Sequence, residues 1–263
     1  LSCAPTEPVE THDDTSVLQD FINNSSGTLD MNLDIDSSGV IEPLELGEQN
    51  WDENGRIISL HCNNIGLSGR IPESIGKWTQ LEKLVLKANN LGGEIPLSIG
   101  NLEHLTQLSL INDSLSGIIP DTIGNLKSLT NLVLSNNEFS GSIPNSIGEL
   151  SVLHTLLADS NSFSGSIPSG LCNIENLEIS NNQFCDSQPF CIDSPEIMGY
   201  QDCSCSNDEN KISGYCYLQS DLDVLQDFIN NADSLNMIMD TDTLEGVQPL
   251  ELGFQEWQSG RLK

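Results

Sequence analysis

The sequence predicts a solenoid, a fold in which short coils of the chain stack along one axis. Between residues 57 and 184 the chain repeats with a period of 24 residues. One position of the repeat is always leucine or isoleucine, at Ile57, Leu81, Leu105, Leu129 and Leu153. The second half of each unit reads LSGRIPESIG, LGGEIPLSIG, LSGIIPDTIG, FSGSIPNSIG and FSGSIPSGLC. A single coil buries too little apolar surface to be stable, so the coils must stack and the open ends need caps.

Each unit begins with a short strand, because inward leucines alternate with outward side chains in segments such as LVLKANN (84–90). An amide follows the strand at Asn89, Asn137, Asn161 and Asn182. A buried amide there can bond the turning backbones of adjacent coils and form a ladder. Asp113 can still accept in this place, whereas Ile65 cannot, so the first coil must turn in another way. Recurrent glycines at 69, 93, 117, 141 and 165 permit a sharp bend, and the following Ile-Pro pairs favour extended backbone.

Residues 57–184 resemble the plant-type leucine-rich repeat, LxxLxxLxLxxNxLxGxIPxxIGxL, in five full copies and one partial copy. The resemblance implies a leucine-rich-repeat solenoid of the α/β type. In this family short parallel strands form the concave side, irregular or 3-10 segments form the convex side, and both ends are capped. PLELGEQNWDENGRIISL (43–60) is similar to the N-terminal cap, with Trp51 covering the first coil. NNQFCDSQPFC (181–191) is similar to a cysteine-bearing C-terminal cap of secreted members. The cysteine pair that usually precedes the first strand is missing.

An internal duplication sets the expected domain boundaries. VLQDFINN occurs at 17–24 and again at 224–231, and PLELG at 43–47 returns at 249–253. The two copies have diverged between these segments, which indicates a tandem duplication with a spacing of about 206 residues. We therefore expect a connector at 1–16, an N-terminal cap at 17–56, repeats at 57–184, a cysteine-rich C-terminal cap at 185–216, and the truncated cap of the next unit at 217–263. We expect the chain to be a segment of a longer protein, with Leu1 a processed or trimmed end.

The charge excludes some partners. The chain has 39 acidic and 9 basic residues, a net charge of −30. Nucleic acid needs a basic surface, and an anionic membrane surface is disfavoured for the same reason. No membrane span is expected in this segment, because no apolar run approaches roughly 18 residues. The acids are concentrated before residue 57 and after residue 184, where they serve solubility or bind a divalent cation.

Eight cysteines indicate an oxidising, extracellular compartment. The disulfide candidates are Cys3, Cys62, Cys172, Cys185, Cys191, Cys203, Cys205 and Cys216. Cys62 is expected either in a disulfide or as a small buried hydrophobe. A zinc site is the competing interpretation of the cluster that begins at Cys185, but the closely spaced cysteine pairs of tetrahedral zinc sites are absent.

The segment DIDSSGVIEPLE (34–45) fits the twelve-residue EF-hand calcium loop. The candidate calcium ligands are Asp34, Asp36, Ser38, Glu42 and Glu45, with Gly39 at the turn. Calcium needs six to eight oxygen ligands around a tight turn, and this spacing provides them. The second copy lacks the serine and glycine at these positions, and GTLDMNL is a poor entering helix. An acidic cap loop without metal therefore remains the alternative.

Two further sets of residues are candidate surface sites. Asn23, Asn24 and Asn112 lie in N-x-[ST] sequons and are glycan acceptors if the protein is secreted by a eukaryote. The concave face is predicted to present His61, Lys83, Val85, Lys87, Ser109, Val133 and Leu157. This face has few aromatic or charged residues, so an ordinary solvated strand face competes with a binding patch.

The favoured function is structural, an extracellular filament or cell-surface fibre of tandem units joined end to end. Its partners would be neighbouring units of the same protein, and glycans where the sequons are used. The alternative is a receptor or adhesin ectodomain that binds a peptide, glycan or surface protein on its concave face. An enzyme is not expected, because no histidine has a nucleophile at a recognisable spacing and no GxSxG elbow occurs. Calcium is the one cofactor expected.

Overall fold

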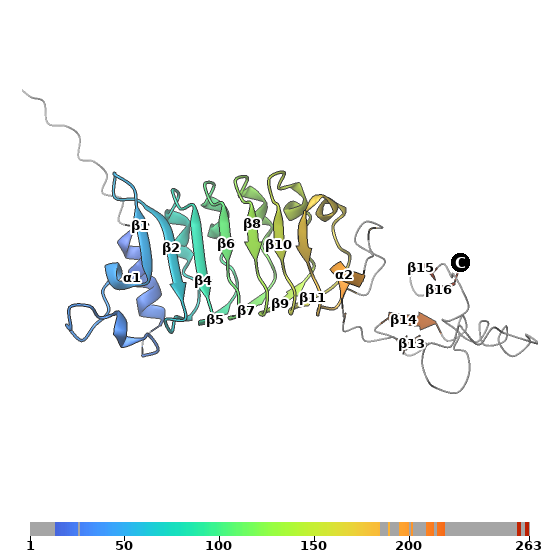
Figure 1. Cartoon of the computed structure of the whole chain (residues 1–263), viewed down its shortest axis with the longest axis horizontal. Coiled ribbons are helices and arrows are strands. Elements are labelled where there is room, and N and C mark those ends of the chain that lie inside the picture. The colour runs from blue at the N-terminus through green and yellow to red at the C-terminus, as the bar shows by residue number, and fades with distance from the viewer. Residues whose placement is uncertain are drawn as a thin grey trace, which may run out of the picture.

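The structure is a computed structural model in which stacked coils form an elongated solenoid (Figure 1). It describes residues 14–25, 27–184, 189, 195–199 and 201, and four short strands beyond them. The parallel sheet and the 3-10 segments on the other side confirm the predicted solenoid class. No helix in the described part of the chain is long and apolar enough to cross a membrane.

A seven-stranded sheet runs along one face of the solenoid. The first pair of strands is antiparallel and the other pairs are parallel, with one strand from each coil. The strands are β1 (Glu48–Trp51), β2 (Ile57–Asn63), β4 (Lys83–Lys87), β6 (Gln107–Ser109), β8 (Asn131–Val133), β10 (Thr155–Leu157) and β12 (Asn176–Glu178). The register of parallel pairing follows the sequence repeat, so equivalent positions of successive units lie side by side.

Each coil returns through a second sheet and a 3-10 helix. The second sheet comprises β3 (Ser68–Gly69), β5 (Asn90–Gly93), β7 (Ser114–Gly117), β9 (Glu138–Gly141) and β11 (Ser162–Phe163). The 3-10 helices of the coils are Glu73–Lys77, Leu97–Asn101, Asp121–Asn125, Asn145–Glu149 and Ser169–Asn173, and two more, Met31–Leu33 and Pro43–Glu45, lie in the cap. The bend glycines have φ between 72° and 77°, as the sequence predicts. Gly124 has another role, because a Cβ there would lie 2.5 Å from the Ser146 Cβ of the next coil.

Beyond the repeats the structure describes only short elements. They are α2 (Pro195–Met198), β13 (Glu209–Ile212), β14 (Tyr215–Leu218), β15 (Trp257–Gln258) and β16 (Arg261–Leu262). Most of the predicted C-terminal cap (185–216) and of the second cap copy (217–263) lies outside the described residues.

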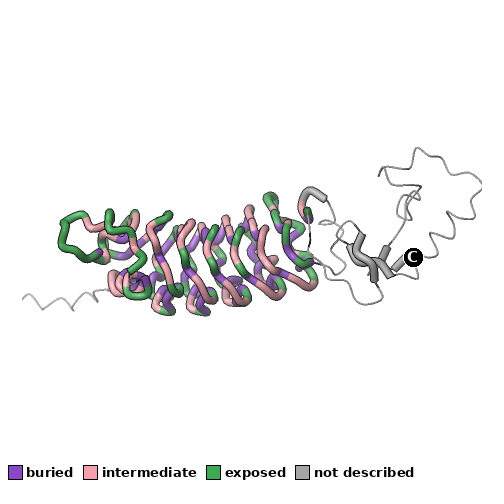
Figure 2. Tube along the Cα trace, turned by 90° about the horizontal axis from the view of Figure 1, so that it is seen from below, coloured by how far each residue is buried: buried purple, intermediate pink, exposed green. Residues whose placement is uncertain are grey.

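The core is a column of apolar side chains along the inside of the solenoid. Figure 2 colours the chain by burial and shows buried segments that recur in every coil. Leu84, Leu108 and Leu132 come from successive strands and are fully buried. On the side of the second sheet, the rings of Phe139, Phe163 and Phe184 stack in sequence, with centroids 6.1 and 6.4 Å apart. Because each side chain packs on its counterparts in the coils above and below, stacking supplies the burial that one coil lacks.

The predicted amide ladder is present at the turn that follows the concave strands. The Asn161 Oδ1 accepts from the backbone N–H of Phe139 at 3.1 Å, and its Nδ2 donates to carbonyls that include that of Leu134 at 3.0 Å. Asn89 and Asn182 make equivalent bonds across their own pairs of coils. Each amide therefore satisfies backbone groups that would otherwise be buried without partners.

Both ends of the ladder use other residues. At the first coil, where Ile65 replaces the amide, the backbone N–H of Asp30 donates to the Ile65 carbonyl at 3.0 Å. The N–H of Ser68 donates to the Ser25 Oγ at 2.9 Å, so the cap holds this turn. After the last coil, the buried Gln201 accepts from the N–H of Phe184 at 3.0 Å and extends the ladder.

The N-terminal cap closes the solenoid with a helix and an edge strand. The helix α1 (Thr15–Asn24) carries the duplicated octapeptide, and its side chains Val17, Leu18 and Phe21 are buried. The Phe21 ring stacks on that of Trp78 at 6.0 Å. Trp51 lies on β1, half-buried against the core of the first coil, as predicted.

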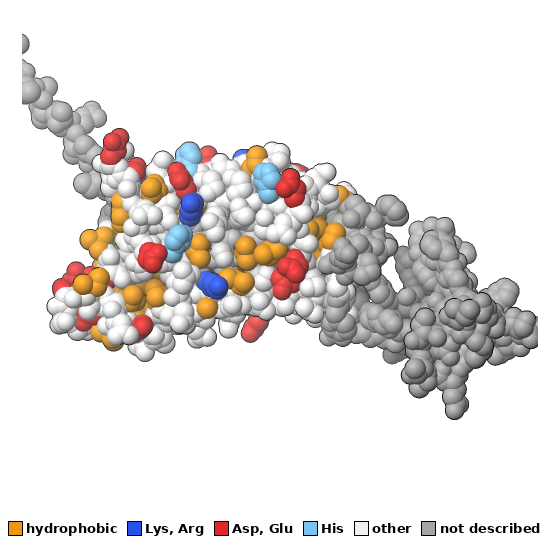
Figure 3. Space-filling view, in the orientation of Figure 1, with side chains coloured by type: hydrophobic (Ala, Val, Ile, Leu, Met, Phe, Trp, Pro, Cys, Tyr) orange, Lys and Arg blue, Asp and Glu red, His pale blue; other side chains and the backbone are white. Residues whose placement is uncertain are grey.

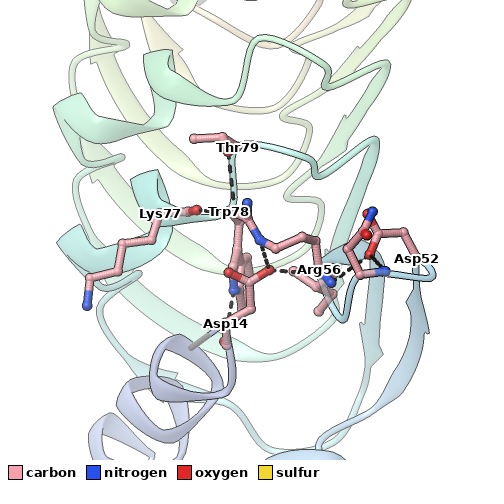
Figure 4. A network of polar contacts seen from close by, with 8 residues as sticks. Asp14, Asp52, Arg56, Lys77, Trp78 and Thr79 are labelled. Atoms are coloured by element: carbon pink, nitrogen blue, oxygen red, sulfur yellow. Dashed lines mark hydrogen bonds and ion pairs between the residues drawn. The ribbon is translucent and has the colours of Figure 1, made fainter. Parts of the chain in front are cut away.

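A buried polar network ties this cap to the first coil (Figure 4). The Asp14 carboxylate accepts from the Arg56 Nε at 3.0 Å and from the backbone N–H of Ile57 at 2.9 Å. The Arg56 Nη2 donates to the Lys77 carbonyl at 2.9 Å, and the Trp78 Nε1 donates to the Asp14 carbonyl at 3.0 Å. The side chains of Asp14 and Arg56 are only 3% and 9% exposed. Each buried charge is therefore stabilised by its partner and would be costly without it.

This network places the start of the cap earlier than the sequence predicts. The connector was expected to extend through residue 16, but Asp14 is buried and α1 begins at Thr15. The tract before the octapeptide contains several acids and prolines. Nothing in the sequence distinguishes Asp14, which pairs with Arg56 42 positions later, from the other acids of this tract.

Replacing Asp14 with alanine is expected to destabilise the protein by about 3–5 kcal/mol, because the buried Arg56 guanidinium loses its counter-charge and the Ile57 N–H loses its acceptor. Urea unfolding, followed by circular dichroism, measures the change. Glu53→Ala is the matched control, since it also removes one acid near Arg56 but from an exposed turn, and it should change stability by less than about 0.5 kcal/mol. Equal effects of the two substitutions would contradict the role assigned to Asp14.

Candidate functional site

The outward side chains of the seven-stranded sheet form columns that cross the coils. One column places His61, Val85, Ser109, Val133, Leu157 and Glu178 in register. The column beside it holds Ser59, Lys83, Gln107, Asn131, Thr155 and Asn176. The pairing therefore brings together all the concave-face residues that the sequence singles out, including Lys87, which is the last residue of β4.

This face has an apolar centre and ends of opposite charge. Val85, Val133 and Leu157 are half-buried and lie between the exposed Lys83 and Lys87 on one side and the exposed Glu178 on the other. Figure 3 shows basic and histidine side chains near β2 and β4 with acidic ones beside them, hydrophobic side chains in the middle, and a further acidic group toward β12.

One acidic residue at the edge of this face is not predicted by the repeat pattern. Asp159 follows Leu157 by two positions, and its carboxylate accepts from the hydroxyl of Ser135 and, at 3.1 Å, from that of Ser160. Ser135 is itself buried, at 3% exposure, in the coil before. The two hydroxyls hold the Asp159 carboxylate in place beside the apolar centre, and the strand alternation continued past Leu157 was the signal that could have identified it.

The predicted calcium loop brings together three of its five candidate ligands. Carboxylate oxygens of Asp34, Asp36 and Glu45 lie within 4.8 Å of one another. The backbone N–H of Ser38 donates to both aspartates, at 3.0 and 2.9 Å. This N–H, together with the Ser38 hydroxyl, lowers the pKa of Asp36 from its ordinary value. The loop is therefore acidic, tightly turned and exposed.

The other two candidates are not part of this carboxylate group. The Ser38 hydroxyl donates to the Val40 carbonyl at 3.1 Å, and Glu42 is an exposed residue whose N–H donates to Glu45 at 2.9 Å. The segment before the loop forms only the 3-10 turn Met31–Leu33, in place of an entering α-helix. The loop therefore turns as an EF-hand loop does, but no α-helix leads into it.

The three glycosylation candidates are all exposed. Asn23 and Asn24 end α1, where the Asn24 Nδ2 donates to the Arg70 carbonyl at 2.9 Å. Asn112 has a left-handed backbone, with φ of 60°, at the turn after β6. Asn23 and Asn112 therefore project from the surface, whereas the Asn24 side chain is held against the first coil.

Cys62 is a buried free thiol on β2, so of the two alternatives it is the small buried hydrophobe. Burial raises the pKa of this thiol to about 12, which keeps it protonated and unreactive. Cys172 is disulfide-bonded. Five candidates, Cys3, Cys185, Cys191, Cys203 and Cys205, lie outside the described residues, and only the backbone of Cys216 is described, in β14.

Asp113 is a titratable group inside the amide ladder. Its Oδ1 accepts from the N–H of Leu91 at 3.0 Å, as predicted, but its buried Oδ2 has no partner. In the neighbouring coil, Asn137 uses its amide nitrogen at this place to donate to the carbonyls of Leu110 and Leu134. Burial raises the pKa of Asp113 to about 6, against smaller lowering effects of backbone N–H groups.

Comparison with known proteins agrees with this geometry. The family model described as leucine rich repeat matches residues 79–139. A chain of the BIR3–SERK2 complex from Arabidopsis thaliana is 33% identical with a TM-score of 0.55, and the match covers 67% of this chain and 97% of that one. This protein belongs to the leucine-rich-repeat family, and its repeats are of the plant type. No curated protein sequence matches it.

Two further leucine-rich-repeat structures are similar over a smaller share of their own length. The ectodomain of the Arabidopsis receptor kinase HAESA, in complex with an N-terminally extended IDA peptide hormone, is 33% identical with a TM-score of 0.52. The match covers 60% of this chain and 27% of that one. The PEPR1–AtPEP1 structure is 28% identical with a TM-score of 0.60, covering 68% and 26%. This leucine-rich-repeat chain thus spans about a quarter of the length of these two.

Asp113→Asn is expected to stabilise the leucine-rich-repeat domain at pH 7.5 by roughly 1 kcal/mol, an amount discounted for partial exposure of the site. The amide supplies a donor where the carboxylate has none. In the wild type, the pKa of Asp113 is higher in the folded state than in the unfolded state. Protonation of Asp113 therefore stabilises the fold fully below about pH 3.8, and this stabilisation is lost as the pH rises through about 6. The advantage of the amide should therefore shrink as the pH falls, which urea unfolding at several pH values measures.

Asn137→Asp provides the converse control, because it introduces a carboxylate at the same place in the next coil. It should destabilise the protein at pH 7.5 and less at pH 4.5. An Asp113→Asn effect that does not depend on pH would contradict this assignment.

Proposed function

We propose that this chain is an extracellular recognition module whose concave sheet binds a polypeptide ligand. The observation that carries the proposal is the concave face, where half-buried Val85, Val133 and Leu157 form an apolar row. A partly exposed apolar row among charged side chains is typical of an interaction surface. The family relationship adds support, since the similar structures include a receptor ectodomain with a bound peptide hormone and a complex of two proteins.

The filament, which the duplicated sequence favoured, receives less support. The filament hypothesis is supported by the tandem copies and by the short stretch of sequence between the predicted C-terminal cap and the next N-terminal cap. Neither the similar structures nor the described contacts add to that argument. A chain with tandem units is compatible with recognition, because each unit would present its own concave face.

Selection of random decapeptides displayed on phage, with the full chain as the target, tests the proposal. We expect peptides that bind the wild type and lose binding on the variant Val133→Glu/Leu157→Glu, because carboxylates disrupt the apolar row. Leu97→Glu/Val152→Glu is the matched control: it places the same charges at two exposed apolar positions outside the concave sheet, and it should retain binding. Failure to select any peptide that depends on Val133 and Leu157 would refute the proposed function.

We retain calcium as the proposed ligand of the cap loop, supported by the close approach of Asp34, Asp36 and Glu45. Calorimetric titration should give a Kd of about 0.1–1 mM, the range of extracellular calcium modules. Calcium at about ten times its Kd should stabilise the protein by about 1.4 kcal/mol.

Asp34→Asn/Asp36→Asn should abolish both effects, whereas Asp52→Asn/Glu53→Gln, in the acidic turn before β2, should leave them unchanged. If the wild type shows no heat of binding and no stabilisation in 10 mM calcium, the loop is an acidic cap without metal.

A further inference from the structure

The concave face holds two lysines, one at each end of β4, in a chain with a large excess of acids. Only five basic residues occur between 57 and 184, and two of them, Lys83 and Lys87, lie on the outward side of β4 with Val85 between them. Both are exposed. Among the described residues the one ion pair is that of Arg56 with Asp14, so neither lysine has an acidic partner in that part of the chain.

Two carboxylates occupy the opposite end of the same face. Glu178 lies on β12 in register with Leu157, and Asp159 lies just beyond β10, held by the hydroxyls of Ser135 and Ser160. These acids are also without a basic partner among the described residues. The two lysines therefore lie toward one end of the solenoid axis and the two acids toward the other.

The distance between the two ends suits a short extended segment. Neighbouring strands of a sheet lie about 4.8 Å apart, so the four steps from β4 to β12 span about 19 Å. An extended polypeptide advances about 3.3 Å per residue, so five to seven residues cover this distance. Small side chains such as Ser109, on β6 between Val85 and Val133, leave room for the ligand's own side chains.

We propose that the concave face selects an extended polypeptide segment with a defined order of charge. An acidic side chain lies at the Lys83 and Lys87 end, apolar side chains cover Val133 and Leu157, and a basic side chain lies at the Asp159 and Glu178 end. This inference rests on the proposed function and adds the chemistry of the ligand.

Because the chain is strongly acidic overall, binding of the ligand's acidic side chain depends on Lys83 and Lys87. A net charge of −30 repels acidic peptides and attracts basic ones without regard to position. Acceptance of an acidic side chain therefore requires a local positive site, and Lys83 with Lys87 is the site that this face offers. His61, beside Val85 on β2, adds a hydrogen-bonding ring, while Glu48 on β1 closes the basic area on its outer side.

The test uses the peptides selected on the full chain through their dependence on Val133 and Leu157. Their sequences should show acidic residues at one end and basic residues at the other, separated by apolar ones. One such peptide, labelled with a fluorophore, is then titrated with the wild type, with Lys83→Glu/Lys87→Glu, and with the control Lys77→Glu/Lys127→Glu. The control makes the same change in net charge at exposed lysines outside the concave sheet.

We expect the Lys83→Glu/Lys87→Glu variant to lose affinity by at least about tenfold, since it replaces two attractions with repulsions, and the control to change affinity by less than about threefold. A peptide whose acidic residues are replaced by lysine should regain affinity for the variant. Both results support the proposed charge order.

Two outcomes would overturn the inference. Selected peptides without acidic enrichment would show that the lysines do not choose the ligand. Equal losses of affinity for the variant and its control would show that only the overall charge matters. A different result refutes the proposed function itself: no selected peptide depends on Val133 and Leu157, as when binding depends on the exposed Ile118 beside the second sheet.

Discussion

Everything in this structure depends on how adjacent coils satisfy each other's backbone groups. The amides of Asn89, Asn137 and Asn161 each join two coils, accepting from an N–H of one and donating to carbonyls of both. A turn buried at this point would otherwise leave polar groups without partners, at a cost of about 1–3 kcal/mol each. Since the ladder fixes the spacing of the turns, it also fixes the register of the strands, and through them the columns of the concave face.

This dependence explains which features could be predicted from the sequence. A period of 24 residues assigns each outward position to a column, so the neighbours of Val133 on the concave face follow from counting. Contacts that do not follow the period could not be found in that way. Asp14 pairs with Arg56 across 42 residues, and Gln201 extends the ladder from outside the repeat, with glutamine in place of asparagine. The amide-to-acid change at Asp113 was visible in the sequence, but the missing donor at its Oδ2 required the structure.

Among the candidate sites, too, the features that follow the 24-residue period could be predicted and the others could not. The periodicity predicted which residues share the columns of the concave face, but it did not single out Asp159, two positions after Leu157. The cap loop is not periodic, and the motif assigned five ligands where the structure groups only Asp34, Asp36 and Glu45. Function is less determined still, because the fold supports both assembly and recognition. The apolar row of the concave face and the charges there that have no partner among the described residues are the observations on which our proposal of recognition rests.

The stacked phenylalanines have a mechanical consequence. The position that is leucine in the first three coils, at Leu67, Leu91 and Leu115, becomes Phe139, Phe163 and Phe184 in the last three. Asp113, the one ladder residue with an unpartnered oxygen, belongs to the third coil. In a solenoid, the free energy of unfolding is the sum of a contribution from each coil and a contribution from each interface between neighbouring coils. The weakest interface therefore determines where the coils separate first. At this core position the first three coils are therefore aliphatic and the last three aromatic, and under load the solenoid should open near the third coil before either end unfolds.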